Sequence, residues 1–136
     1  MALTLSICLS SCSKSPKEML VGEYEVTSIS TDQKMIPEIA EIWNETVETI
    51  KKTSGLTLRA DGSAEDTSNG ITRKGTWEVY GDEEENGEGW RLKITREDKS
   101  TINMEIHDLS DSGFTYIQPD DASNSTTVIV YSKTKK

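Results

Sequence analysis

Cysteine is absent from the sequence after residue 12, since its two cysteines are Cys8 and Cys12. The rest of the chain therefore cannot form an internal disulfide, provide a thiolate nucleophile or bind a metal through sulfur. The one histidine, His107, alternates onto the polar face of a predicted strand, where a general base is not expected. The serines lack a matching set of His and Asp partners. We therefore predict that the protein is not an enzyme and uses no cofactor.

The sequence also has few basic residues. The 136 residues include 15 Lys and Arg against 24 Asp and Glu, which gives a net charge of −9. This charge repels phosphate backbones, so no nucleic acid is expected as a partner. The acidic run from Asp82 to Glu88 lacks the ordered alternation of an EF-hand calcium loop. We expect this run to be the solvated tip of a hairpin, and we predict no metal site.

The sequence has no apolar run of the roughly 20 residues that a membrane-spanning helix needs. Residues 2–9 are mostly apolar and uncharged, which fits the second half of the apolar core of a signal peptide. The segment 13–19 that follows is mostly polar and carries Pro16, as expected for a tether. We predict a leader over residues 1–12, a tether over 13–19 and one domain over 20–133, because the length is that of a single domain.

The leader ends in Leu9-Ser10-Ser11-Cys12, which resembles the lipobox of bacterial lipoproteins: an aliphatic residue, two small residues and a cysteine. In that motif the thiol accepts a diacylglycerol, and several acyl chains hold a protein on a bilayer more firmly than one. The resemblance implies lipidation of Cys12 and a membrane anchor. The resemblance to such lipoproteins implies the outer membrane of a Gram-negative bacterium, and because no acidic cluster follows Cys12 we expect its periplasmic face.

Between residues 20 and 132, apolar and polar residues alternate with a period of two in short stretches. Turn signals such as Asp61-Gly62 and Asn69-Gly70 separate these stretches. About eight strands are predicted, and nearly every connection has the length of a hairpin. We therefore predict a mainly β fold, an antiparallel up-and-down barrel, because closure of the sheet removes its exposed edges.

An eight-stranded barrel is either filled by side chains or holds one small ligand. Large apolar residues dominate the set that the alternation places inside, which favours a filled interior with at most a shallow pocket near the helix. The residues predicted to face the interior are Leu20, Tyr24, Val26, Leu56, Leu58, Trp77, Val79, Trp90, Leu92, Ile94, Ile102, Met104, Ile106, Phe114, Tyr116, Val128 and Val130.

One stretch, residues 36–52, has the periodicity of an amphipathic helix and lies between the first and second predicted strands. Its apolar residues recur at spacings of three and four: Ile36, Ile39, Trp43, Val47 and Ile50, with Ile42 beside them. Such a stripe must cover something. The helix either caps one end of the barrel or gates a cavity.

Three short motifs resemble a known family. The segment Leu20 to Tyr24 is similar to the Gly-x-Trp opening of lipocalins, with Tyr24 in place of the tryptophan. Leu58-x-x-Asp61-Gly62 and Gly75-Thr76-Trp77 resemble recurring features of the small lipocalin-like lipoproteins of Gram-negative bacteria. The resemblance covers residues 20–132. It implies a calycin-type β-barrel, a location in the cell envelope and, by analogy with lipocalins, a ligand.

Two functions stay open from the sequence. The first is a lipid-anchored barrel that binds a small apolar or amphipathic ligand at its helix-capped end. The second is a structural or interaction lipoprotein whose barrel is filled by side chains and contacts an envelope partner. If a ligand site exists, aromatic side chains are expected to form its walls, because their rings provide contact area and a polar group. The candidate ligand-binding residues are Tyr24, Trp43, Trp77, Trp90 and Tyr116.

Overall fold

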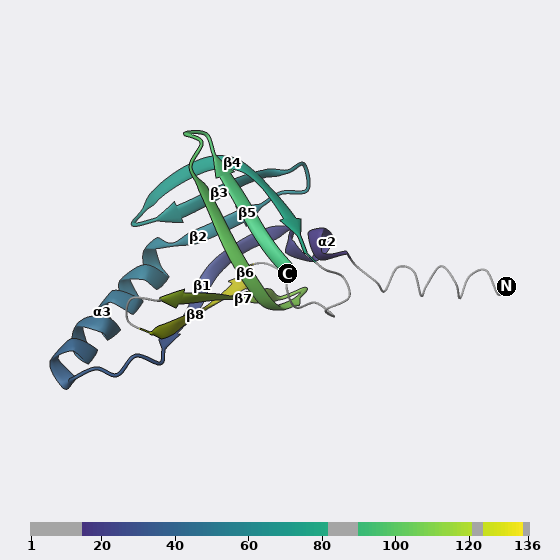
Figure 1. Cartoon of the computed structure of the whole chain (residues 1–136). Coiled ribbons are helices and arrows are strands. Elements are labelled where there is room, and N and C mark those ends of the chain that lie inside the picture. Colours follow the sequence, from purple (N-terminus) through teal and green to yellow (C-terminus); the bar gives the residue numbers. More distant parts are fainter. Residues whose placement is uncertain (1–14, 82–89, 121–123, 135–136) are drawn as a thin grey trace, which may run out of the picture.

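The computed structural model describes residues 15–81, 90–120 and 124–134, and these form a closed antiparallel barrel (Figure 1). Each strand pairs with the next along the chain, and the last strand returns to the first. The predicted mainly β, up-and-down barrel is therefore confirmed. The strands are β1 (Gly22–Thr31), β2 (Gly55–Leu58), β3 (Ser63–Ser68), β4 (Ile71–Tyr80), β5 (Trp90–Arg96), β6 (Thr101–Ser110), β7 (Gly113–Asp120) and β8 (Ser125–Lys133).

The core follows from the period-two alternation. In β5, Trp90, Leu92 and Ile94 point inward, and they pair with Ile106, Met104 and Ile102 of β6 respectively. Burying these side chains removes apolar surface from water, which is the main driving force for closing the sheet. The buried apolar residues are Leu20, Tyr24, Val26, Leu56, Leu58, Ala64, Trp77, Trp90, Leu92, Ile94, Met104, Ile106 and Phe114.

A short helix, α2 (Pro16–Leu20), covers the second half of the predicted tether, residues 13–19, and the first residue of the predicted domain. Ser15 caps it: the Ser15 hydroxyl accepts a hydrogen bond from the Glu18 amide, and the Glu18 carboxylate accepts one from the Ser15 amide. Its last residue, Leu20, is 0% exposed, and the carbonyl of Leu20 accepts a 2.7 Å hydrogen bond from the Tyr24 hydroxyl. The helix therefore closes the barrel end at which β1 begins.

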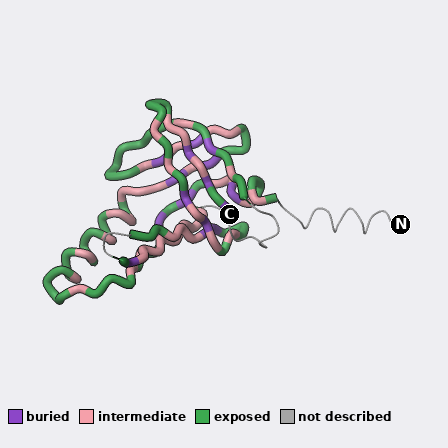
Figure 2. The backbone as a smooth tube through the Cα atoms, in the orientation of Figure 1, coloured by how far each residue is buried: buried purple, intermediate pink, exposed green. Residues whose placement is uncertain are grey.

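The long helix, α3 (Pro37–Thr53), connects β1 to β2, one residue from the predicted bounds. None of its residues, all of which are described, is buried. Trp43, Val47 and Ile50 are half-buried, whereas Ile39 and Ile42 are 47% and 59% exposed. Figures 1 and 2 show the helix projecting beyond the barrel with most of its surface in solvent. The apolar stripe is therefore partly covered from Trp43 to the C-terminal end of α3, and its first turn is exposed.

The predicted interior is correct except in the last strand. Tyr131 of β8 pairs with Val26 and Phe114, and Ile129 pairs with Tyr116, so Ile129 and Tyr131 face inward. Val128 and Val130, which the sequence analysis placed inside, face outward, and that prediction is wrong. The strand reads Val-Ile-Val-Tyr and is apolar on both faces, so alternation cannot choose its register. A one-residue slip then moves every side chain to the other face.

The motifs behind the family resemblance have physical roles in the barrel. A Cβ atom at Gly75 would run into the backbone of Thr95 and Arg96 on β5, so that position requires glycine. The Trp77 indole donates a 2.8 Å hydrogen bond to the Arg59 carbonyl, which joins β4 to the turn after β2. In that turn Gly62 has φ +92°, a conformation that favours glycine. These roles concern the fold and identify no ligand.

Candidate ligand-binding site

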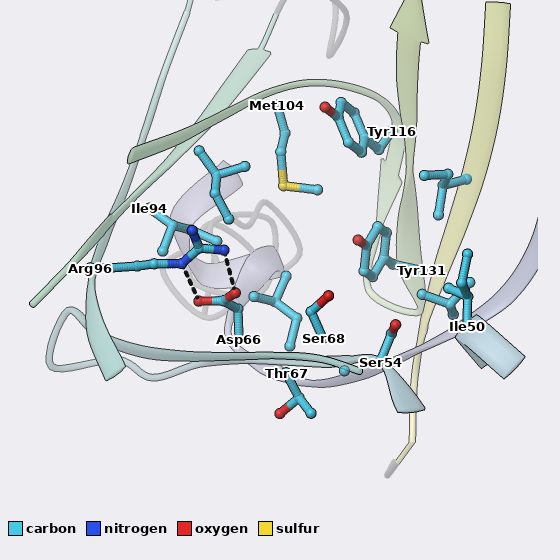
Figure 3. Close-up of a pocket in the computed structure, with 15 residues that line it drawn as sticks. Ile50, Ser54, Asp66, Thr67, Ser68, Ile94, Arg96, Met104, Tyr116 and Tyr131 are labelled. Carbon is cyan, nitrogen blue, oxygen red and sulfur yellow. Dashed lines mark hydrogen bonds and ion pairs between the residues drawn. The ribbon is translucent and has the colours of Figure 1, made fainter. Parts of the chain in front are cut away.

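A partly open cavity of about 190 Å³ lies inside the barrel at the end where α3 joins β2 (Figure 3). In a meander barrel, the connection from β1 to β2 lies at the opposite end from the start of β1, so the cavity and α2 are at opposite ends. The residues that line it are Val26, Ile50, Ser54, Gly55, Leu56, Asp66, Thr67, Ser68, Ile94, Arg96, Ile102, Met104, Tyr116, Ile129 and Tyr131.

One wall of the cavity holds an ion pair. Arg96 of β5 donates two hydrogen bonds to Asp66 of β3: Nε to Oδ1 at 3.1 Å and Nη2 to Oδ2 at 2.7 Å. The side chains are 16% and 11% exposed. Hydrogen bonding to Asp66 raises the pKa of Arg96, which keeps the guanidinium charged. This two-point geometry is the kind that offsets the cost of removing both charges from water. The pair as a whole carries no net charge.

The opposite wall presents two tyrosine hydroxyls. Tyr116 of β7 and Tyr131 of β8 point their hydroxyls into the cavity (Figure 3). Within the described part of the chain, neither hydroxyl has a hydrogen-bonding partner, and neither hydroxyl oxygen is fully buried. Burial raises the pKa of Tyr116. Burial, followed by the proximity of Tyr116 and Asp66, raises the pKa of Tyr131 to about 12. Both phenols are therefore neutral at physiological pH, and each is available to donate a hydrogen bond.

Apolar side chains make up most of the remaining surface. Ile94, Ile102 and Met104 come from β5 and β6, and Ile129 faces them from β8. A concave apolar surface with a few polar groups at fixed positions is typical of a small-molecule site. The polar groups fix the orientation of a ligand, and the apolar surface provides contact area.

The structure brings one of the five predicted ligand-binding residues, Tyr116, to the cavity. Tyr24, Trp77 and Trp90 are buried in the core, and Tyr24 packs its ring against Phe114 at 5.1 Å. Trp43 is half-buried on α3 and is not among the described residues that line the cavity. A role of these residues in ligand binding stays a prediction. Cys12, the predicted lipidation site, lies outside the described residues.

Sequence reasoning missed Asp66, Arg96 and Tyr131. Arg96 continues the inward alternation of β5, and Asp66 shares a face with the buried Ala64, so both were readable from the period. Tyr131 was missed because β8 was assigned the wrong register. A charged residue at an inward position of a predicted strand is the signal that could have located this site.

Other candidate chemistry lies away from the cavity. His107 forms a 2.9 Å hydrogen bond with Glu105, its neighbour on the outward face of β6. The acidic run from Asp82 to Glu88 lies outside the described residues. In the described ranges, no group of three or more His, Cys, Asp or Glu side chains is arranged to hold a metal ion.

The fold and the cavity define the chain as a closed eight-stranded barrel with a partly open internal cavity at one end. No protein-family model matches the sequence, and no curated protein is significantly similar to it. Among the described residues, no helix has the length and apolar character needed to span a bilayer.

Proposed function

We propose that this protein binds a small amphipathic molecule in the cavity at the α3 end of its barrel, and that lipidation of Cys12 anchors it in the cell envelope of a Gram-negative bacterium. The observation that carries the binding proposal is the pair of cavity-facing hydroxyls, Tyr116 and Tyr131, which lack partners among the described residues. Neither hydroxyl oxygen is fully buried, because every fully buried side-chain nitrogen or oxygen of the described residues has a hydrogen-bonding partner, so water can reach both hydroxyls. A ligand that accepts hydrogen bonds would replace that water.

The cavity volume limits the ligand to a small molecule. An apolar cavity of about 150 Å³ is large enough to bind benzene. The cavity described above has about 190 Å³ and is partly open. A single ring with one polar substituent therefore fits it, whereas a long-chain lipid would have to extend beyond it. The alternative function, a barrel filled by side chains that contacts an envelope partner, agrees less well with this hollow end.

The anchor and the cavity are compatible in space. Ser15, which caps α2, follows Cys12 by three residues, and three extended residues span at most about 11 Å. A lipid on Cys12 would therefore keep the α2 end of the barrel close to the membrane. The cavity, at the other end, would face away from the bilayer and be open to molecules in the aqueous phase. The periplasmic face of the outer membrane is the location we propose.

Native mass spectrometry of the full chain, incubated with an extract of bacterial envelope metabolites, tests the binding proposal. We expect a bound molecule at one copy per chain. Ile129→Trp adds a large side chain on the inward face of β8 and should abolish binding. Val130→Trp makes the same change at the adjacent outward position and should preserve it. Binding that is equal in the two variants, or absent in the unaltered chain, contradicts the proposal.

Acyl labelling tests the anchor separately. Cells that express the full chain are grown with radiolabelled palmitate, and incorporation into the protein is measured. We expect labelling that Cys12→Ser abolishes and Cys8→Ser leaves unchanged, since the lipobox places the acceptor thiol at Cys12. Label that persists in the Cys12→Ser variant would show that the anchor is assigned to the wrong residue or does not exist.

A further inference from the structure

The charges around the cavity limit the class of ligand more narrowly than its volume does. Arg96 directs two of its N–H groups at Asp66, and its Nη1 lies 3.5 Å from the Ser100 hydroxyl. The guanidinium is therefore occupied by a carboxylate of the protein itself. An anionic ligand would have to displace Asp66 or approach its negative charge.

A cationic ligand meets the reverse difficulty. The one carboxylate among the described cavity-lining residues, Asp66, is neutralised by Arg96 at 2.7 Å. The hydroxyls on the opposite wall belong to Tyr116 and Tyr131, and phenols are uncharged at neutral pH. A cation that moves from water into this cavity loses its hydration. It finds no unpaired negative charge there to offset that cost in free energy.

We propose that the cavity selects an uncharged, ring-sized ligand that accepts hydrogen bonds from Tyr116 and Tyr131, and that Asp66 determines this selectivity by occupying the guanidinium of Arg96. The inference rests on the proposed function, because it names the ligand class of the same cavity. It also assigns to Asp66 a role beyond stability: without its carboxylate, Arg96 would present an unpaired cation to the ligand.

Three molecules of nearly equal shape test the inference: benzamide, which is neutral, benzoate, which is anionic, and benzylamine, which is cationic at neutral pH. Each is titrated into the ¹⁵N-labelled full chain, and the dissociation constant is obtained from amide shifts of cavity residues. In the unaltered chain we expect benzamide to bind at least about tenfold more tightly than either charged probe, a factor that corresponds to about 1.4 kcal/mol.

Asp66→Asn should change the order of affinities. It leaves the Arg96 guanidinium without its carboxylate partner, so benzoate should become the preferred probe and its affinity relative to benzamide should rise by about tenfold or more. Asp98→Asn is the matched control. Asp98 also acts electrostatically on Arg96, but it is exposed and lies outside the cavity, so the ratio should not change.

A second variant covers the case in which Asp66→Asn does not fold. Asp66→Asn combined with Arg96→Gln removes both charges and should keep the preference for benzamide, while Tyr131→Phe should weaken benzamide binding several-fold without changing the order of affinities.

Benzoate that binds as tightly as benzamide to the unaltered chain overturns the inference and leaves the proposed function standing. If no probe binds while envelope extract still yields a bound molecule, the inference alone fails. If neither binds, the proposed function fails as well.

Discussion

The two ends of the barrel are closed to different extents by the helices next to them. At the α2 end, a five-residue helix inserts Leu20, which is fully buried, and the Tyr24 hydroxyl bonds to the Leu20 carbonyl. At the α3 end, a seventeen-residue helix contributes no buried residue, and a cavity of about 190 Å³ lies beneath it. The short helix plugs its end and the long helix does not, so helix length does not measure how well a barrel end is sealed.

The same contrast holds for the polar groups. The buried tyrosine of the α2 end, Tyr24, has a protein partner, whereas Tyr116 and Tyr131 at the α3 end have none among the described residues. A satisfied buried group contributes to stability, and an unsatisfied one costs free energy unless a ligand or water completes it. The polar group at the α2 end therefore stabilises the fold, and the two hydroxyls at the α3 end are the groups on which the binding proposal rests.

The largest expected difference between the ends is in packing. Leu20→Ala should lower the free energy of unfolding by about 3 kcal/mol, because truncating a fully buried leucine loses transfer free energy and leaves a void. Ile50 is half-buried near the C-terminal end of α3, so Ile50→Ala should lower the free energy of unfolding by less than about 1 kcal/mol. Urea denaturation of both variants measures the two values. Equal losses would mean that α3 seals its end as firmly as α2 does.

A pair of Tyr→Phe changes compares the polar groups. Tyr24→Phe removes the donor to the Leu20 carbonyl and should cost about 2 kcal/mol, because a buried acceptor is left unsatisfied. Tyr131→Phe removes a hydroxyl with no partner in the described residues and should change stability by less than about 0.5 kcal/mol at pH 7. Denaturant midpoints give both numbers. A large loss in Tyr131→Phe would reveal a structural role for that hydroxyl and weaken the case for a ligand.

Alkaline pH should affect the cavity end through Tyr131. An unfolded tyrosine ionises near pH 10, and burial raises the pKa of Tyr131 to about 12. Between these values the unfolded chain has lost a proton that the folded chain retains, so stability is complete below pH 10 and falls as the pH rises toward 12. At pH 11 the loss from this residue should be about 1.4 kcal/mol.

Tyr131→Phe removes that loss and should flatten the alkaline decline with little effect at pH 7. Tyr24, whose pKa is also raised by burial, adds to the same decline, so Tyr24→Phe should flatten it too while lowering stability at pH 7. Unfolding measured from pH 8 to 11 in both variants separates the two residues. An unchanged alkaline slope in Tyr131→Phe would mean that this phenol ionises as in the unfolded chain.

The sequence predicts the structure of the two barrel ends to different extents. Period-two alternation and turn signals predicted the barrel, and the 3.6-residue period predicted α3 to within one residue. The helix α2 was missed because five residues show no periodicity, although Ser15-x-x-Glu18 is a readable capping box. The cavity itself depends on how side chains fill space at the scale of single methyl groups, and residue patterns do not resolve that scale.

The smallest effect is expected on the outer half of α3. Ile39→Lys and Ile42→Lys replace side chains that are 47% and 59% exposed, so each should change the free energy of unfolding by less than about 0.5 kcal/mol. Lys is also at least as good a helix former as Ile, and a lysine at position 42 would lie one turn after Glu38, a favourable i,i+4 pair.

Denaturation of both variants at two protein concentrations measures the change in the free energy of unfolding and shows whether that change depends on association. A loss above about 1 kcal/mol that is independent of concentration would mean that this face packs on the barrel, and the contrast between the two ends would fail. A loss that grows with concentration would instead mean that α3 meets a second chain, because only association makes stability depend on the amount of protein.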